Sequence, residues 1–122
     1  MSHPKASSRN ASAERNVAEA ASVFAALGDE TRLRIVTRLC RAGPQSIVRL
    51  TEGSRVTRQA VTKHLRALSR AGLVRGRRSG RETVWELEPR RLGEVRGYLD
   101  AISTQWDEAI DRLKAFVEPP EA

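Results

Sequence analysis

The sequence predicts a mainly α-helical domain with one small β-hairpin, in the order helix, helix, short helix, helix, hairpin, long helix. Apolar residues recur every three or four positions through most of the chain, which is the period of an amphipathic helix. The stretch "LVRGRRSGRETVWEL" instead shows two strand-like arms around a Ser79-Gly80 turn signal. A length of 122 residues suits one domain with an extra helix for a partner.

The first helix is expected to begin at Asn16, in "NVAEAASVFAAL", and to end at Gly28. Residues 1–15 contain several Ser and Ala with one Asn and one Pro, and they lack the apolar run of a signal peptide, so we expect them to form a disordered tail. The folded domain is therefore expected over 16–117, with a C-terminal tail over 118–122 that contains Pro119 and Pro120.

The second helix, "DETRLRIVTRLCRA", has Asp29 as its N-cap, and the Gly43-Pro44 pair stops it. Its expected buried stripe comprises Leu33, Val36, Leu39 and Cys40. Ser46 is expected to cap a short third helix, "IVRLTE", which Gly53 closes.

The fourth helix is expected to follow Thr57 as its N-cap and to stop at Gly72. Its buried face comprises Val61, Leu65 and Leu68. After the hairpin, Pro89 suits the first turn of a last helix that extends to about Val117. A short helix, a tight turn and a longer helix with a polar outer face form a helix-turn-helix, and the hairpin adds a wing. The predicted fold is a winged helix-turn-helix, α-α-α-α-β-β-α.

Positive charge is concentrated in one part of the chain, whose formal net charge is +7. Of the 22 basic residues, nine lie between Gly53 and Arg81, where there is no acid, and the other 13 are outnumbered by 15 acids elsewhere. A single basic block in an otherwise slightly acidic protein indicates a surface for a polyanion. The nine are Arg55, Arg58, Lys63, Arg66, Arg70, Arg75, Arg77, Arg78 and Arg81.

Three stretches together, "LGDETRLRIVTRL", "VTRQAVTKHLRALSRAGLV" and "GRETVWEL", resemble the ArsR/SmtB family of bacterial winged-helix repressors. The resemblance covers roughly Asn16 to Val117 and implies a homodimer whose two recognition helices enter successive major grooves of an operator. The ending "QWDEAIDRLKAFVE" resembles a branch of the family that lacks metal-ligand motifs.

Base readout needs hydrogen-bonding side chains near the start of the helix that enters the major groove. The outer face of the fourth helix supplies four such side chains, and the resemblance implies that they contact bases: Arg58, Gln59, Thr62 and Lys63. Arg55, Thr57 and Arg66 are better placed for phosphates, which set register. His64, beside them, either supports the helix or contacts a phosphate. The competing interpretation is a solvated helix face.

The wing carries Arg77, Arg78 and Arg81 around its tip, where arginines can enter a narrow minor groove. The competing interpretation is a mobile loop with solvated charge.

The last helix carries an apolar stripe about seven turns long, at about 3.6 residues per turn, which is more than a chain of this size can cover. We expect it to form a homodimer interface with the first helix, rather than to pack within one chain. The expected interface residues are Val17, Phe24, Leu92, Val95, Leu99, Ile102, Trp106, Ile110 and Leu113.

Metal sensing is known in the family, but its ligand types are missing here. The stretch Ile47 to Glu52 has no Cys, and the last helix has carboxylates but no His. His3 and His64 are the chain's histidines, and the single Cys40 is expected on the buried stripe. We therefore expect no metal and no cofactor.

No nucleophile motif and no phosphate-binding glycine loop is present, so the protein is not expected to be an enzyme. The absence of an 18-residue apolar run excludes a transmembrane helix, and we expect a cytoplasmic location.

The sequence predicts a sequence-specific DNA-binding transcriptional regulator, a repressor that binds a near-palindromic operator as a homodimer without metal sensing. The expected partners are double-stranded DNA and a second copy of the chain. The alternatives are a non-specific architectural DNA-binding protein, a protein-interaction module and a metal-responsive repressor. An effector is left open, with Tyr98 and Trp106 either lining a small-molecule pocket or packing in the core.

Overall fold

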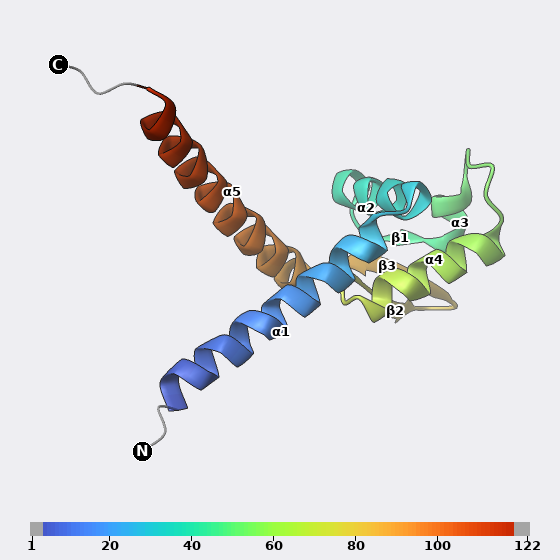
Figure 1. The fold of residues 1–122 in the computed structure, drawn as a ribbon. Helices are drawn as coiled ribbons and strands as arrows, with labels where there is room; N and C mark the ends of the chain where they lie inside the picture. Colours follow the sequence, from blue (N-terminus) through green and yellow to red (C-terminus); the bar gives the residue numbers. More distant parts are fainter. Residues whose placement is uncertain (1–3, 119–122) are drawn as a thin grey trace.

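The structure is a computed structural model that describes the backbone of residues 4–118 and the side chains of residues 15–118 (Figure 1). A body formed by α2, α3, α4 and a small sheet lies at one end, and α1 and α5 extend away from it in diverging directions. The elements are α1 (Pro4–Leu27), α2 (Glu30–Ala42), β1 (Gln45–Ser46), α3 (Ile47–Thr51), α4 (Arg58–Arg70), β2 (Val74–Ser79), β3 (Glu82–Leu87) and α5 (Pro89–Val117). This is the predicted winged helix-turn-helix.

The expected disordered tail is wrong for residues 4–15, because α1 begins at Pro4 rather than at Asn16. Alanine, glutamate and arginine in "ASAERNVAEAA" favour a helix, and proline is tolerated in its first turn. The remaining residues of the two expected tails, 1–3 and 119–122, lie outside the described residues.

The three predicted N-caps are confirmed. In each case the side-chain oxygen accepts a hydrogen bond from the backbone N–H three residues on, at 3.0 Å for Asp29, 3.3 Å for Ser46 and 3.1 Å for Thr57. The predicted stop of α4 is also confirmed, since Gly72 follows the helix with a φ of 78°. These caps fix where the helix-turn-helix begins and ends.

The sheet has three antiparallel strands in the order β1-β3-β2, and β1 was not predicted. At two residues β1 is too short for any alternation to show, yet it pairs Gln45 with Trp85. Ser79 pairs with Glu82, so the hairpin turn is Gly80-Arg81 rather than Ser79-Gly80. Gly80 has a φ of 63°, which the first position of a tight two-residue hairpin turn requires.

The core lies where α2 and α4 pack on the sheet and α1 packs on α2 and α4. The predicted buried face of α4 is confirmed, since Val61, Leu65 and Leu68 are buried. Together with Val23 and Leu73, these are the most deeply buried large side chains. The predicted stripe of α2 is partly wrong, because Leu33 and Cys40 are exposed while Ile35 is buried. Each residue advances about 100° around a helix, which carries Leu33 and Cys40 past the edge of the buried arc.

Within residues 4–118, no helix combines the length and the apolar run that crossing a membrane requires.

Candidate nucleic-acid interface

The helix α4 presents two opposite faces. Its apolar face is fully inside the core, with Leu65 and Leu68 at 0% exposure. Its other face is exposed at Arg58, Gln59 and Lys63, all within about the first two turns. These three predicted base-reading residues therefore lie on the solvent side of the second helix of a helix-turn-helix.

Thr62, the fourth predicted base-reading residue, is half-buried. Its hydroxyl donates a hydrogen bond to the Arg58 carbonyl at 2.8 Å. The hydroxyl proton is therefore engaged within the helix, and the oxygen of Thr62 remains available as an acceptor.

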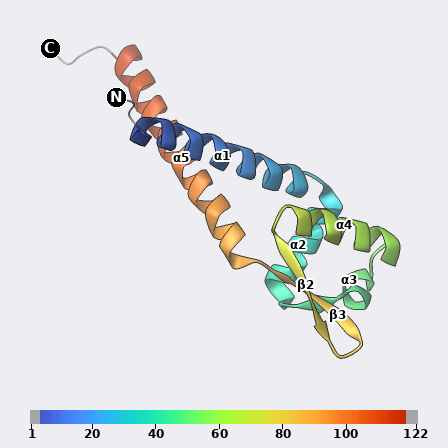
Figure 2. The same cartoon turned by 90° about the horizontal axis from the view of Figure 1, so that it is seen from below.

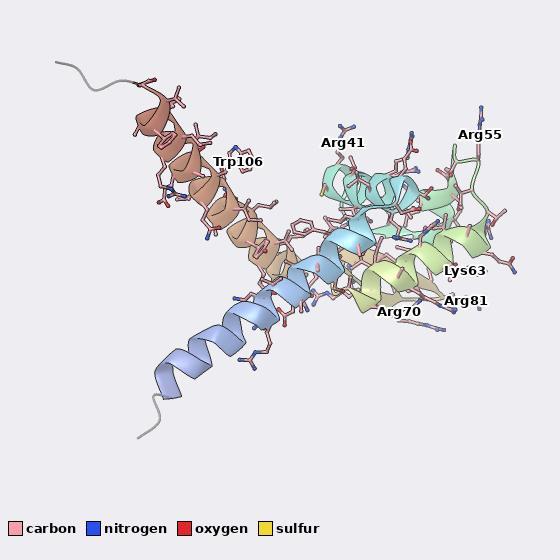
Figure 3. The ribbon with its side chains drawn as sticks, in the orientation of Figure 1. Arg41, Arg55, Lys63, Arg70, Arg81 and Trp106 are labelled. Carbon is pink, nitrogen blue, oxygen red and sulfur yellow. The ribbon has the colours of Figure 1, made fainter. Side chains whose placement is uncertain are left out.

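The cations of this face are not neutralised by carboxylates. Among the described residues, no Asp or Glu pairs with Arg55, Arg58, Lys63 or Arg66. Figure 3 shows Lys63 on α4, Arg55 on the loop before α4, and Arg41 on the side of α2 that is turned away from α4. An anion approaching the face therefore meets free guanidinium and ammonium groups.

Thr57 and Arg55 lie at the approach to α4. The Thr57 hydroxyl oxygen accepts the capping hydrogen bond, so its own proton is free to donate to an anion. Because α4 has 13 residues, its unpaired N-terminal backbone N–H groups and its dipole also favour negative charge at this end.

The wing is an arm of β2 and β3 that projects from the body away from α5 (Figure 2). Its arginines fall into two sets by their pairing. Arg75 and Arg77 both reach Glu86, at 2.9 Å and 3.4 Å, and Arg75 also reaches Glu88 at 3.4 Å. The hydrogen bond from Arg75, followed by the charges of Arg75 and Arg77, lowers the pKa of Glu86.

The tip of the wing is different. Arg78 and Arg81 are exposed, and neither pairs with a carboxylate in the described part of the chain. Of the three predicted wing residues, the structure therefore leaves these two free and engages Arg77. A Gly80-Arg81 turn predicts this contact, because it sets Arg75 directly opposite Glu86 and places Arg77 two residues from Arg75 on the same strand face.

His64 faces the interior rather than the solvent side of α4. Its Nδ1 lies 3.8 Å from Asp29 Oδ2 and 3.5 Å from an Arg32 nitrogen, and its side chain is 23% exposed. Arg32 in turn donates to the Ala26 carbonyl at 2.6 Å. The imidazole thus links α4 to the junction of α1 and α2, which matches the interpretation that it supports the recognition helix.

Asp29 belongs to the same junction. The backbone N–H of Arg32 is the main cause that lowers the pKa of Asp29, and the charges of Arg32 and His64 add to it.

The residues expected at a dimer interface are mostly exposed in the single chain. Val95 is an exception and a correction, because it is 8% exposed and belongs to the protomer's own core. Phe24 and Leu92 pack partly against that core, and the Phe24 and Tyr98 rings lie 6.3 Å apart. The remaining six are exposed: Val17, Leu99, Ile102, Trp106, Ile110 and Leu113.

Metal-ligand types do not gather anywhere in the described residues, where no group of three His, Cys, Asp or Glu side chains could hold an ion. His3 lies outside those residues. Cys40, expected in the core, is exposed on α2.

Comparison with known proteins agrees with this geometry. Residues 27–77 match the family model described as a helix-turn-helix domain. The chain is 40% identical over 80 residues to the "HTH-type transcriptional regulator Rv2034" of Mycobacterium tuberculosis, covering 66% of this chain and 74% of that protein. It is 33% identical over 97 residues to the "HTH-type transcriptional repressor SmtB" of the same species, covering 79% and 70%.

A solved structure is similar to this chain in both fold and sequence. The "ArsR-like Transcriptional Regulator from Rhodococcus sp. RHA1" has a TM-score of 0.74 and 40% identity, covering 85% of this chain and 97% of that one.

Proposed function

Because the chain belongs to the ArsR family of DNA-binding transcriptional regulators, which are not enzymes, we propose that it is a sequence-specific repressor that binds a near-palindromic operator as a homodimer. The observation that carries this proposal is the exposed face of α4. It combines unpaired hydrogen-bond donors and acceptors at the start of the helix with a complete absence of acids from Gly53 to Arg81.

The first part of the proposal assigns base readout to Arg58, Gln59, Thr62 and Lys63. At a rise of about 1.5 Å per residue, the span from Arg58 to Lys63 is about 7.5 Å, or roughly two base-pair steps. Arg58 suits the O6 and N7 acceptors of guanine, and Gln59 suits adenine. Lys63 and the oxygen of Thr62 complete a mixed set of donors and acceptors.

The second part assigns backbone contacts to the groups around this face. Arg55 and Thr57 precede the start of α4, Arg66 lies in its second half, and we assign all three to phosphates, which fix the register of the helix. Arg78 and Arg81 at the wing tip contact the neighbouring groove or its phosphates, because both are exposed and unpaired with carboxylates among the described residues.

The third part is the homodimer. Trp106 is 67% exposed and Leu113 is 63% exposed on a 29-residue helix that extends away from the body. A contiguous apolar stripe of this length in water marks an interaction surface. A second copy of the same stripe is its simplest complement, and a two-fold axis then presents two copies of α4 to two half-sites.

Repression without a metal is the fourth part. A dimer seated across two major grooves excludes other proteins from the same DNA. The described residues offer no metal-ligand cluster, and the α3 segment Ile47–Thr51 contains no Cys or His.

The proposal is tested with the wild-type protein by selecting bound duplexes from genomic fragments and titrating the enriched duplex against a scrambled duplex of equal length. We expect a preference of at least about 1000-fold, the lower range for specific over non-specific binding, and a near-palindrome in the enriched fragments. Equal binding to both duplexes, with a steep salt dependence, would identify an architectural DNA-binding protein instead.

A further inference from the structure

One guanidinium joins three helices at the point where the body meets the two long helices. Arg91, in the first turn of α5, donates to Glu19 of α1 at 3.3 Å and to Glu94 of α5 at 3.1 Å. The side chain of Arg91 is 30% exposed, so the guanidinium is partly shielded from water, whereas the side chains of Glu19 and Glu94 are exposed.

The same guanidinium lies against the end of α4. A Cβ added to Gly72, the residue after the C-cap of α4, would lie 2.7 Å from Arg91 Nε and 3.3 Å from its Cζ. A backbone hydrogen bond from Glu88 to the Leu73 carbonyl, at 2.8 Å, brings the start of α5 to this position. Gly72 is therefore constrained twice, by its φ of 78° and by the side chain that covers it.

A cation at this place is electrostatically favourable, because the C-terminal end of a helix carries partial negative charge. Arg91 thus lies against the C-terminal end of α4, the helix that carries the proposed base-reading face, while its Nη1 donates to carboxylates of both α1 and α5. Its neighbour Arg90 differs, since it is 88% exposed and reaches only Glu94, at 3.7 Å.

We propose that Arg91 is a positioning residue that couples the arrangement of α1 and α5 to the orientation of α4, and so sets DNA affinity without contacting DNA. The proposal rests on the proposed DNA binding and dimerisation. A tilt of about 5° at the end of a helix about 20 Å long moves its other end by about 2 Å. Base contacts tolerate far less, since their donor–acceptor distances fall within about half an ångström.

The test compares Arg91→Gln with Arg90→Gln, which removes the same charge one residue away and leaves Gly72 and Glu19 untouched. Affinity for the enriched duplex is measured over a range of salt, at protein concentrations where sedimentation gives the same dimer fraction and circular dichroism the same folded fraction. We expect Arg91→Gln to lose about tenfold in affinity, which lies within the range of coupling effects at a distance. Arg90→Gln should stay within about twofold of the wild type.

The salt dependence separates positioning from direct contact. A residue that does not touch phosphate leaves the slope of log affinity against log salt unchanged, whereas loss of a phosphate contact reduces the slope by about one. An unchanged slope with weaker binding supports the proposal. A reduced slope, or an Arg91→Gln affinity equal to that of the wild type, overturns it.

A double-substitution cycle tests the link to α1. Glu19→Gln alone is expected to weaken binding less than Arg91→Gln, because Glu94 still holds the guanidinium. In the Arg91→Gln background, Glu19→Gln should cause no further loss, since the contact it removes is already gone. Fully additive losses would overturn the coupling. Failure of the wild type to prefer the enriched duplex would count against the proposed function, and is measured separately.

Discussion

Glu86 lies directly opposite Arg75 across the wing hairpin, and Arg75 Nε donates to Glu86 Oε1 at 2.9 Å. The other carboxylate oxygen of Glu86 accepts from Arg77 at 3.4 Å. One acid thus occupies two of the wing's arginines in the absence of DNA. Since a phosphate would compete for the same guanidinium groups, we expect Glu86 to limit the charge of the wing that is free to bind DNA.

Releasing these arginines should strengthen DNA binding. We expect Glu86→Gln to raise affinity at low salt and to steepen the slope of log affinity against log salt by about one, because Arg77 loses its carboxylate while Arg75 keeps Glu88 at 3.4 Å. Glu82→Gln, at the tip of the same strand, is the matched control because it removes the same charge without releasing an ion pair. Equal effects of the two substitutions would mean that only net charge matters.

The cap at Asp29 should make stability depend on acid pH. The pKa of Asp29 is lowered in the folded state, mainly by the Arg32 backbone N–H, so its charge stabilises the fold above the unfolded pKa. That contribution is lost as the pH falls through the folded pKa. Asp29→Asn removes this charge, so it should lower the urea midpoint at pH 7. Because Asn still caps a helix, the difference from the wild type should vanish in strong acid, where Asp29 is neutral as well.

The matched control for this prediction is Asp107→Asn, at an exposed site on α5. It should leave the urea midpoint unchanged throughout the range. A gap between the wild type and Asp29→Asn that persists at the lowest pH would show that the charge of Asp29 is not the cause.

A charge on the apolar stripe should disrupt the dimer. We expect Trp106→Lys to weaken self-association by about 30-fold or more, because buried tryptophans at an interface commonly contribute at least about 2 kcal/mol. Thr104→Lys adds the same charge two residues away, where the Thr104 hydroxyl bonds the Asp100 carbonyl on another face of the helix. Sedimentation equilibrium measures both. A dimer equally stable in the two variants would place the interface elsewhere.

Zinc should not act as an effector. Among the described residues, His, Cys, Asp and Glu do not form a group of three that could hold an ion, so affinity for the enriched duplex should be the same in zinc as in a chelator. A change of about fivefold or more, the lower range of allosteric coupling, would establish metal sensing. His3→Ala would then show whether the undescribed N-terminus supplies a ligand.

Local chemistry made most of the fold predictable. The caps at Asp29, Ser46 and Thr57, and the glycine after α4, act through residues only three or four positions apart. Non-local pairing did not show in the sequence, because the two residues of β1 are held only by β3, about 40 residues away along the chain.

Two contacts were missed for different reasons. A turn placed one residue early, at Ser79-Gly80, would pair Arg75 with Val84, and so hides the contact with Glu86 that the true register creates. The contact of Arg91 with Glu19 spans 72 residues, so no helical or strand periodicity could indicate it. The proposed base-reading set could be predicted because its members share one short helix face.

The assignment of base readout to the start of α4 is the central claim, and Arg58→Ala tests it most directly. Affinities for the enriched and the scrambled duplex are measured at one salt concentration, with Arg41→Ala, an exposed cation on the far side of α2, as the control. We predict that Arg58→Ala reduces the ratio of the two affinities by about 10- to 100-fold, the value of one good side-chain–base contact, while Arg41→Ala leaves the ratio unchanged. Equal loss of affinity for both duplexes would contradict the claim, because it would reduce Arg58 to a phosphate contact.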